Sequence, residues 1–96
     1  MLFRSRLIDT LTIVNERGLH ARAASSFVNV ASRYSSVITV QKDAHSVDGK
    51  SILGVVSLLG VRGTRIVVTV EGEDAHEALG ALRQLVAYGF KDEAPR

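Results

Sequence analysis

The chain has 96 residues, a net charge of +2 and no cysteine, which excludes disulfides, thiolate zinc sites and cysteine nucleophiles. This length suits one compact domain, and a hydrophobic content of 46% is enough for ordinary apolar packing to stabilise it. So small a positive charge is weak evidence for nucleic-acid binding, and the three histidines lack the spacing of a zinc site.

Residues 1–6 lack the apolar core of a secretory signal, and no stretch approaches the roughly 20 apolar residues of a membrane span. We therefore expect a cytoplasmic protein that does not insert into membranes. No linker or repeat interrupts the sequence, so we predict a single domain over residues 1–96. Its core is expected at 7–88, with a flexible tail at 91–96.

The first predicted element is a strand over 7–14, where β-branched and apolar residues alternate with polar ones. Turn chemistry at 15–18 ends this strand. An amphipathic helix follows over 21–34, with an apolar stripe at Ala24, Phe27, Val28, Ala31 and Tyr34. Ser35 and Ser36 interrupt that helix.

Two short strands are predicted next, over 37–41 and 45–47, and Asp48-Gly49 is a strong turn signal after them. Ser51 can cap a short helix over 52–59, and the glycines at 60 and 63 open a loop.

The region 64–70 alternates as a strand does, with Ile66, Val68 and Val70 on one face. Asp74 and Glu77 resemble a capping box at the start of the last helix. That helix has an apolar side made of Ala75, Ala78, Leu79, Leu82, Leu85 and Val86.

The predicted order is therefore β-α-β-β-α-β-α. Three of the strand patterns are half-buried, which indicates an antiparallel or mixed sheet with helices on one face. Among the α+β folds we favour an open-faced β-sandwich, although periodicity alone does not separate it from other small sandwiches.

A histidine and an arginine lie at the start of the first predicted helix, in Gly18-Leu19-His20-Ala21-Arg22-Ala23-Ala24. The first N–H groups of a helix lack partners within it, and the helix dipole is positive there, so this end favours an anion. A neutral imidazole is a competent nucleophile near pH 7, and the guanidinium of Arg22 can bind a phosphoryl group. These residues fit phosphoryl acceptance. On position alone, a single histidine is more often a helix cap or a surface residue.

The same segment resembles the active-site motif of HPr, the histidine-containing phosphocarrier of the bacterial phosphotransferase system. The segment Val47-Asp48-Gly49-Lys50-Ser51-Ile52-Leu53-Gly54 resembles the second motif of that family, around its regulatory serine. The spacing of the two motifs and the order of elements agree with the family from Leu7 to Val86. The resemblance thus covers nearly the whole chain.

This resemblance implies an HPr-like fold, a four-stranded antiparallel sheet with three helices on one face. His20 would accept a phosphoryl group on Nδ1 from Enzyme I, with phosphoenolpyruvate as the ultimate donor, and pass it to a histidine of an EIIA-type acceptor. Arg22 and the backbone of Ala21, Arg22 and Ala23 would contact the phosphoryl group. The chain would be a carrier rather than an enzyme, monomeric, and without a metal or cofactor.

One position departs from the family, which usually has proline where this chain has Ala23. Alanine leaves the first turn less rigid and adds one N–H that can face the phosphate. Some proteobacterial members also carry alanine, so the change is compatible with phosphotransfer. It leaves open whether the chain serves sugar uptake or nitrogen regulation.

The sequence allows two interpretations of the role of Ser51. Locally it is a helix N-cap, while in many family members this serine is phosphorylated by a dedicated HPr kinase. The helix after it is apolar on more than one side, so some of its side chains should be exposed. In the family, positions matching Ile52, Leu53 and Val56 help to form a docking surface.

Two other classes of function remain as alternatives. A module of the same fold can act by docking, regulated through Ser51 and without phosphotransfer, but the presence of both His20 and Arg22 argues against that loss. A small RNA-binding domain would need an exposed basic and aromatic surface, and no such cluster is evident.

Overall fold

The computed structural model describes residues 4–91, and its elements follow the predicted order β-α-β-β-α-β-α. The strands are β1 (Ser5–Thr12), β2 (Val37–Lys42), β3 (His45–Asp48) and β4 (Arg65–Gly72). The helices are α1 (Ala21–Ala31), α2 (Ile52–Ser57) and α3 (Ala75–Ala87). Of the predicted tail at 91–96, all but Lys91 lies outside the described residues.

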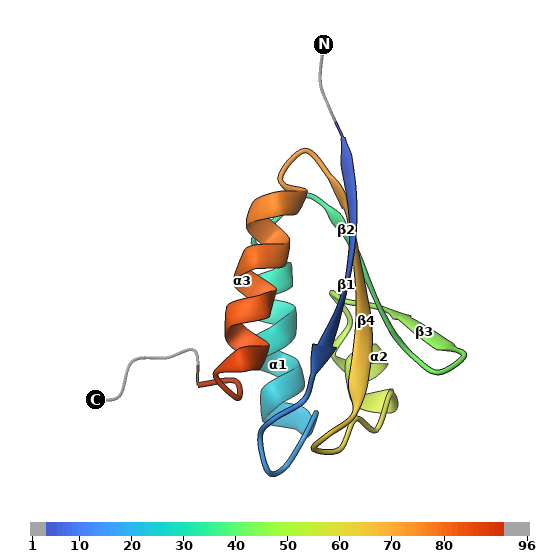
Figure 1. Ribbon diagram of the computed structural model, residues 1–96, viewed down its shortest axis with the longest axis vertical. Helices are drawn as coiled ribbons and strands as arrows, with labels where there is room; N and C mark the ends of the chain where they lie inside the picture. Colours follow the sequence, from blue (N-terminus) through green and yellow to red (C-terminus); the bar gives the residue numbers. More distant parts are fainter. Residues whose placement is uncertain (1–3, 92–96) are drawn as a thin grey trace.

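The four strands form one antiparallel sheet in the order β1-β4-β2-β3 (Figure 1). β4 is an inner strand, and its Val70 lies opposite Leu7 of β1 on one side and Ile38 of β2 on the other. The two strands that β4 joins are far apart in sequence, so the sheet is built mainly from long-range pairings. The predicted four-stranded antiparallel sheet is confirmed.

One face of the sheet carries the core. Ile66, Val68 and Val70 of β4 are fully buried, as their alternation predicts, and α1 and α3 lie side by side against this face (Figure 1). Phe27 of α1 is also fully buried, and burial of one such side chain contributes about 1.5–3 kcal/mol. The predicted apolar side of α3 is buried throughout, at Ala75, Ala78, Leu79, Leu82, Leu85 and Val86.

The short helix α2 packs on the same face, beside the hairpin of β2 and β3. Val47 of β3 lies opposite the buried Val40, so both side chains point towards the helices. A Cβ placed on Gly54 of α2 would lie 3.2 Å from the Cβ of Val47, which shows how closely helix and hairpin pack. The other face of the sheet is open, and there Ile8 and Val37 are 55% and 61% exposed.

Every predicted strand, and the first and second helices, shift by one to three residues at one or both ends, and α2 ends at Ser57 rather than at 59. The first strand covers Ser5–Thr12 rather than 7–14, although Ile13 stays buried and exchanges hydrogen bonds of 2.8 and 2.7 Å with Thr64 and Gly63. The first helix ends at Ala31 rather than at 34, because Arg33 and Tyr34 bond to carbonyls only three residues earlier and tighten the last turn. In this first strand and first helix the apolar pattern of the sequence continues beyond the last regular backbone hydrogen bond, so the pattern predicted an end that is too late.

The predicted capping box at α3 is wrong. Asp74 is the N-cap residue, but its side chain makes no capping bond to its own helix. Its carboxylate instead accepts hydrogen bonds from the backbone N–H groups of Ser35 and Ser36, at 2.8 and 3.0 Å, and from the Ser36 hydroxyl. Four donors in the turn before β2, the N–H and the hydroxyl of each serine, compete better for the carboxylate than one helical N–H does.

Candidate functional site

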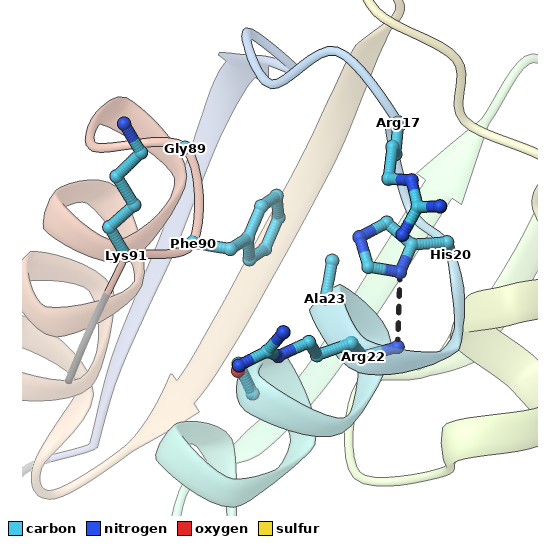
Figure 2. Close-up of a pocket in the computed structure, with 8 residues that line it drawn as sticks. Arg17, His20, Arg22, Ala23, Gly89, Phe90 and Lys91 are labelled. Carbon is cyan, nitrogen blue, oxygen red and sulfur yellow. Dashed lines mark hydrogen bonds between the residues drawn. The ribbon is translucent and has the colours of Figure 1, made fainter.

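His20 is the N-cap residue of α1. Its backbone is extended, at φ −70° and ψ 176°, and its Nδ1 accepts a hydrogen bond of 3.3 Å from the backbone N–H of Arg22 (Figure 2). A ring nitrogen that accepts carries a lone pair, so in the neutral ring the proton is on Nε2. The cap reading of His20 is therefore correct, and the same geometry directs Nδ1 towards the first turn of the helix.

The loop before α1 fixes where His20 lies. Asn15 and Gly18 close a turn through two hydrogen bonds, Gly18 N to the Asn15 carbonyl at 3.1 Å and Asn15 Nδ2 to the Gly18 carbonyl at 2.9 Å. Leu19 donates to the Gly60 carbonyl at 2.8 Å, which ties the loop to the segment after α2. Gly18 has φ +67°, and a Cβ there would lie 2.2 Å from the Gly60 oxygen, so only glycine fits this crossing.

A depression of about 390 Å³ opens beside His20. Its lining residues come from the loop, from α1 and from the turn after α3, and they are Arg17, His20, Arg22, Ala23, Ser26, Gly89, Phe90 and Lys91. Three of these side chains are cationic and none is acidic. In Figure 2 the Arg17 guanidinium lies next to the imidazole, Arg22 runs along the helix towards Phe90, and the Lys91 ammonium points away. The depression therefore favours an anionic group next to the histidine.

The turn after α3 supplies the far wall, which the sequence analysis missed. Phe90 N bonds to the Leu85 carbonyl at 2.8 Å and Gly89 N to the Val86 carbonyl at 3.0 Å, which together are a Schellman motif with Gly89 at φ +68°. This motif turns the buried Phe90 back towards the core, and Lys91 follows it at the rim. The glycine directly after the apolar helix pattern was the available signal for this turn.

Ser51 is the N-cap of α2, as predicted, and its half-buried hydroxyl accepts a 3.0 Å hydrogen bond from Gly54 N. The residue before it is anchored elsewhere, because Lys50 Nζ donates to the Tyr34 carbonyl at 2.7 Å. This bond ties the Ser51 turn to the chain just after α1. The position of Ser51 thus depends on α1 as well as on its own helix.

The helix α2 leaves apolar side chains uncovered, as its sequence indicates. Leu53 is 83% exposed and Ile52 43%, Val56 is half-buried, and Val55 alone of the helix is fully covered. The helix packs against α1, and the chain directly after it contacts Leu19 through Gly60. The helix that carries the exposed apolar side chains therefore lies next to the segment that leads into His20.

The other two histidines lie apart from this depression. His45 is an exposed residue of β3 and His76 an exposed residue of α3. Among residues 4–91, no group of three His, Asp or Glu side chains is arranged to hold a metal ion. Over the same residues, none of the helices combines the length and apolar character needed to cross a bilayer.

Comparison with known proteins agrees with this geometry. A family model described as "PTS HPr component phosphorylation site" matches residues 8–88. The chain belongs to the HPr family. The phosphocarrier protein HPr of Pseudomonas aeruginosa is 46% identical over 83 residues, which cover 85% of this chain and 92% of that protein.

Solved HPr structures share the fold. HPr-C-His from Thermoanaerobacter tengcongensis superposes with a TM-score of 0.86 at 42% identity, over 92% of this chain and 99% of that one. The structure of an HPr dimer from the same organism has a TM-score of 0.72 at 44% identity, over 83% of this chain and 92% of that one. The open-faced sandwich predicted for this chain is thus the fold of its family.

Proposed function

We propose that this HPr-family chain accepts a phosphoryl group on Nδ1 of His20 from phosphorylated Enzyme I and passes it to a histidine of an EIIA-type acceptor. The observation that carries the proposal is the direction of Nδ1, which faces the first-turn N–H of Arg22. A phosphoryl group on this nitrogen would take up the lone pair that now accepts the Arg22 N–H, and its oxygens would then reach that freed N–H, the N–H groups of Ala21 and Ala23 and the guanidinium of Arg22.

The transfer needs no cofactor on this chain. The Nδ1 lone pair attacks the phosphorus of the donor's phosphohistidine while the donor's nitrogen–phosphorus bond breaks, and the electron pair of that bond stays on the donor imidazole. The second transfer repeats this step with His20 as the leaving group. Each transfer breaks one nitrogen–phosphorus bond and forms another, so the carrier can exchange the phosphoryl group in both directions. The chain therefore acts as a substrate of its partners rather than as a catalyst.

We further propose that partners dock on α2 and the start of α1. Ile52 and Leu53 are exposed apolar side chains of α2, Val56 is half-buried between them and the core, and Arg22 is an exposed cation of α1. Apolar surface of this kind is stabilising when a partner covers it. Docking here would bring the partner's histidine to the His20 depression.

Ser51 is the proposed regulatory site for an HPr kinase or phosphorylase. A phosphate on its oxygen would add a charge of about −2 directly before the exposed Ile52 and Leu53. The N-terminal position in α2 makes this charge compatible with the fold, whereas an apolar docking surface is weakened by a charge that must be desolvated. Phosphorylated Ser51 would therefore reduce docking while leaving His20 intact.

The test is incubation of the purified protein with phosphoenolpyruvate and cognate Enzyme I, followed by intact-mass measurement. We expect a gain of one acid-labile phosphoryl group, which is lost in His20→Ala and kept in His45→Ala, the matched exposed histidine. No gain with an active Enzyme I would contradict the proposal and would leave the docking module without phosphotransfer as the better account. Light scattering of the same sample measures the molar mass in solution and so tests whether the protein is a monomer, as we expect.

A further inference from the structure

Arg17 is the cation that Figure 2 draws beside the imidazole of His20, three residues away along the chain. Its side chain lines the same depression, and the ring lies between it and the backbone N–H of Arg22. The first-turn N–H groups therefore approach the ring from the helix, while Arg17 approaches from the loop. No helical stripe or motif of the sequence marks this arginine.

The loop gives Arg17 a defined position. Arg17 is one of the two residues inside the turn that Asn15 and Gly18 close. Gly18 is held in place because it packs directly against the backbone of Gly60. The other residue of that turn, Glu16, lines a different depression, beside Tyr88 and the end of α3. Glu16 thus does not line the His20 depression, and no ion pair joins it to Arg17 among the described residues, so the Arg17 charge is available to an anion.

We propose that Arg17 is a second guanidinium contact for the phosphoryl group on His20, and this inference rests on the function proposed above. A phosphoryl group on the ring carries up to two negative charges on three oxygens, more than the helix N-terminus and one arginine can pair fully. A planar guanidinium binds two of those oxygens at once. Arg17 then stabilises the phosphorylated form of the carrier relative to the free form.

The consequence is a shift in the phosphotransfer equilibrium. Without Arg17 the phosphorylated carrier is less stable, so the equilibrium with Enzyme I moves towards the donor by up to about fivefold, the upper end of the range for an exposed ion pair. The ionisation of the phosphoryl group changes as well. A nearby cation favours the dianion, so removal of Arg17 raises the second pKa of the phosphoryl group.

The experiment compares Arg17→Ala and Arg17→Lys with Arg33→Ala, an exposed arginine just after the opposite end of α1. Each protein is phosphorylated, the equilibrium constant with Enzyme I is measured, and the phosphorus-31 chemical shift of phosphohistidine is titrated with pH. Thermal unfolding checks that each variant folds. We expect a lower equilibrium constant and a higher phosphoryl pKa in Arg17→Ala, partial recovery in Arg17→Lys, and no change in Arg33→Ala.

Two failures are distinguishable. If the parent protein gains no phosphoryl group from Enzyme I, the proposed function fails, and the Arg17 contact is then tested on protein phosphorylated with phosphoramidate, which modifies imidazoles without an enzyme. If the parent is phosphorylated on His20 but Arg17→Ala has the same phosphoryl pKa and the same equilibrium constant with Enzyme I as Arg33→Ala, only the Arg17 inference is overturned. An unchanged phosphoryl pKa in the phosphoramidate product overturns it too.

Discussion

Asp74 binds Ser36 through both the backbone N–H, at 3.0 Å, and the side-chain hydroxyl, although 38 residues separate them. The same carboxylate also accepts the N–H of Ser35. The start of α3 is thereby tied to the start of β2, at the end of the molecule opposite the start of α1 (Figure 1). Gly72 packs directly against the Ser36 side chain, because a Cβ on Gly72 would lie 2.4 Å from the Ser36 Oγ.

This contact predicts a pH-dependent stability. Hydrogen bonds from the Ser36 hydroxyl and from Ser35 lower the pKa of Asp74 below its ordinary value of 3.8. A carboxyl with a depressed folded-state pKa stabilises the fold above its unfolded pKa, and this contribution is lost as the pH falls through the folded value. In urea denaturation, Asp74→Ala should have a lower free energy of unfolding than the parent at pH 7. This difference should shrink as the pH is lowered towards about pH 2.

Glu73→Ala is the matched control for Asp74, because Glu73 is the adjacent exposed acid. We expect it to unfold as the parent does at neutral pH. A difference between Asp74→Ala and the parent that stays constant across the acid range would show that the ionised carboxylate is not what stabilises the turn.

Ser51→Ala should lower the free energy of unfolding by about 1 kcal/mol, the usual cost of losing an N-cap hydroxyl. The bond lost is the one from Gly54 N to the Ser51 oxygen. His20 lies on another helix, so its phosphorylation by Enzyme I should persist. Urea denaturation measures the first effect and the mass assay the second, with Ser46→Ala on the exposed face of β3 as control.

Ala23→Pro tests the departure from the usual family motif. The first helical bond of α1 comes from Ala24 N to the His20 carbonyl, so the N–H of residue 23 precedes the regular ladder. We expect proline there to be tolerated and to stabilise the fold by about 0.5 kcal/mol, while phosphotransfer falls because one N–H near the phosphoryl group is gone.

The contrasting variant for that experiment is Ala24→Pro, one residue further on. It removes the bond to His20 and should cost about 3 kcal/mol. Equal stability of the two proline variants would mean that the first turn does not begin where the structure has it. Full phosphotransfer in Ala23→Pro would remove the N–H of residue 23 from the proposed phosphoryl contacts.

Leu53→Ser should weaken binding to Enzyme I by roughly fivefold or more, the effect expected of an anchor residue in a protein interface. The side chain is 83% exposed, so the substitution should leave stability nearly unchanged. Isothermal titration calorimetry gives the affinity. The control is Ile8→Ser, which removes an apolar side chain that is 55% exposed on the open face of the sheet. Equal loss in both variants would argue against docking on α2.

Local chemistry determined much of this protein from sequence alone. The alternation of Ile66, Val68 and Val70 predicted the buried face of β4, and the apolar side of α3 predicted its packing. Both follow from the repeat of each element, which depends only on neighbouring residues. The cap at Ser51 and the helix start at His20 are equally local, since each pairs a side chain with an N–H two or three residues away.

Tertiary structure decided the contacts between distant segments. The Asp74 side chain bonds to Ser35 and Ser36 rather than to its own helix, because packing places four donors beside it. Arg17 and Phe90 meet at one depression because the turn after α3 packs on the loop before α1, where a Cβ on Gly89 would lie 3.4 Å from that of Asn15. Such meetings depend on how whole helices dock on the sheet. Neither periodicity nor capping chemistry carries that information, since both describe a chain only over a few residues.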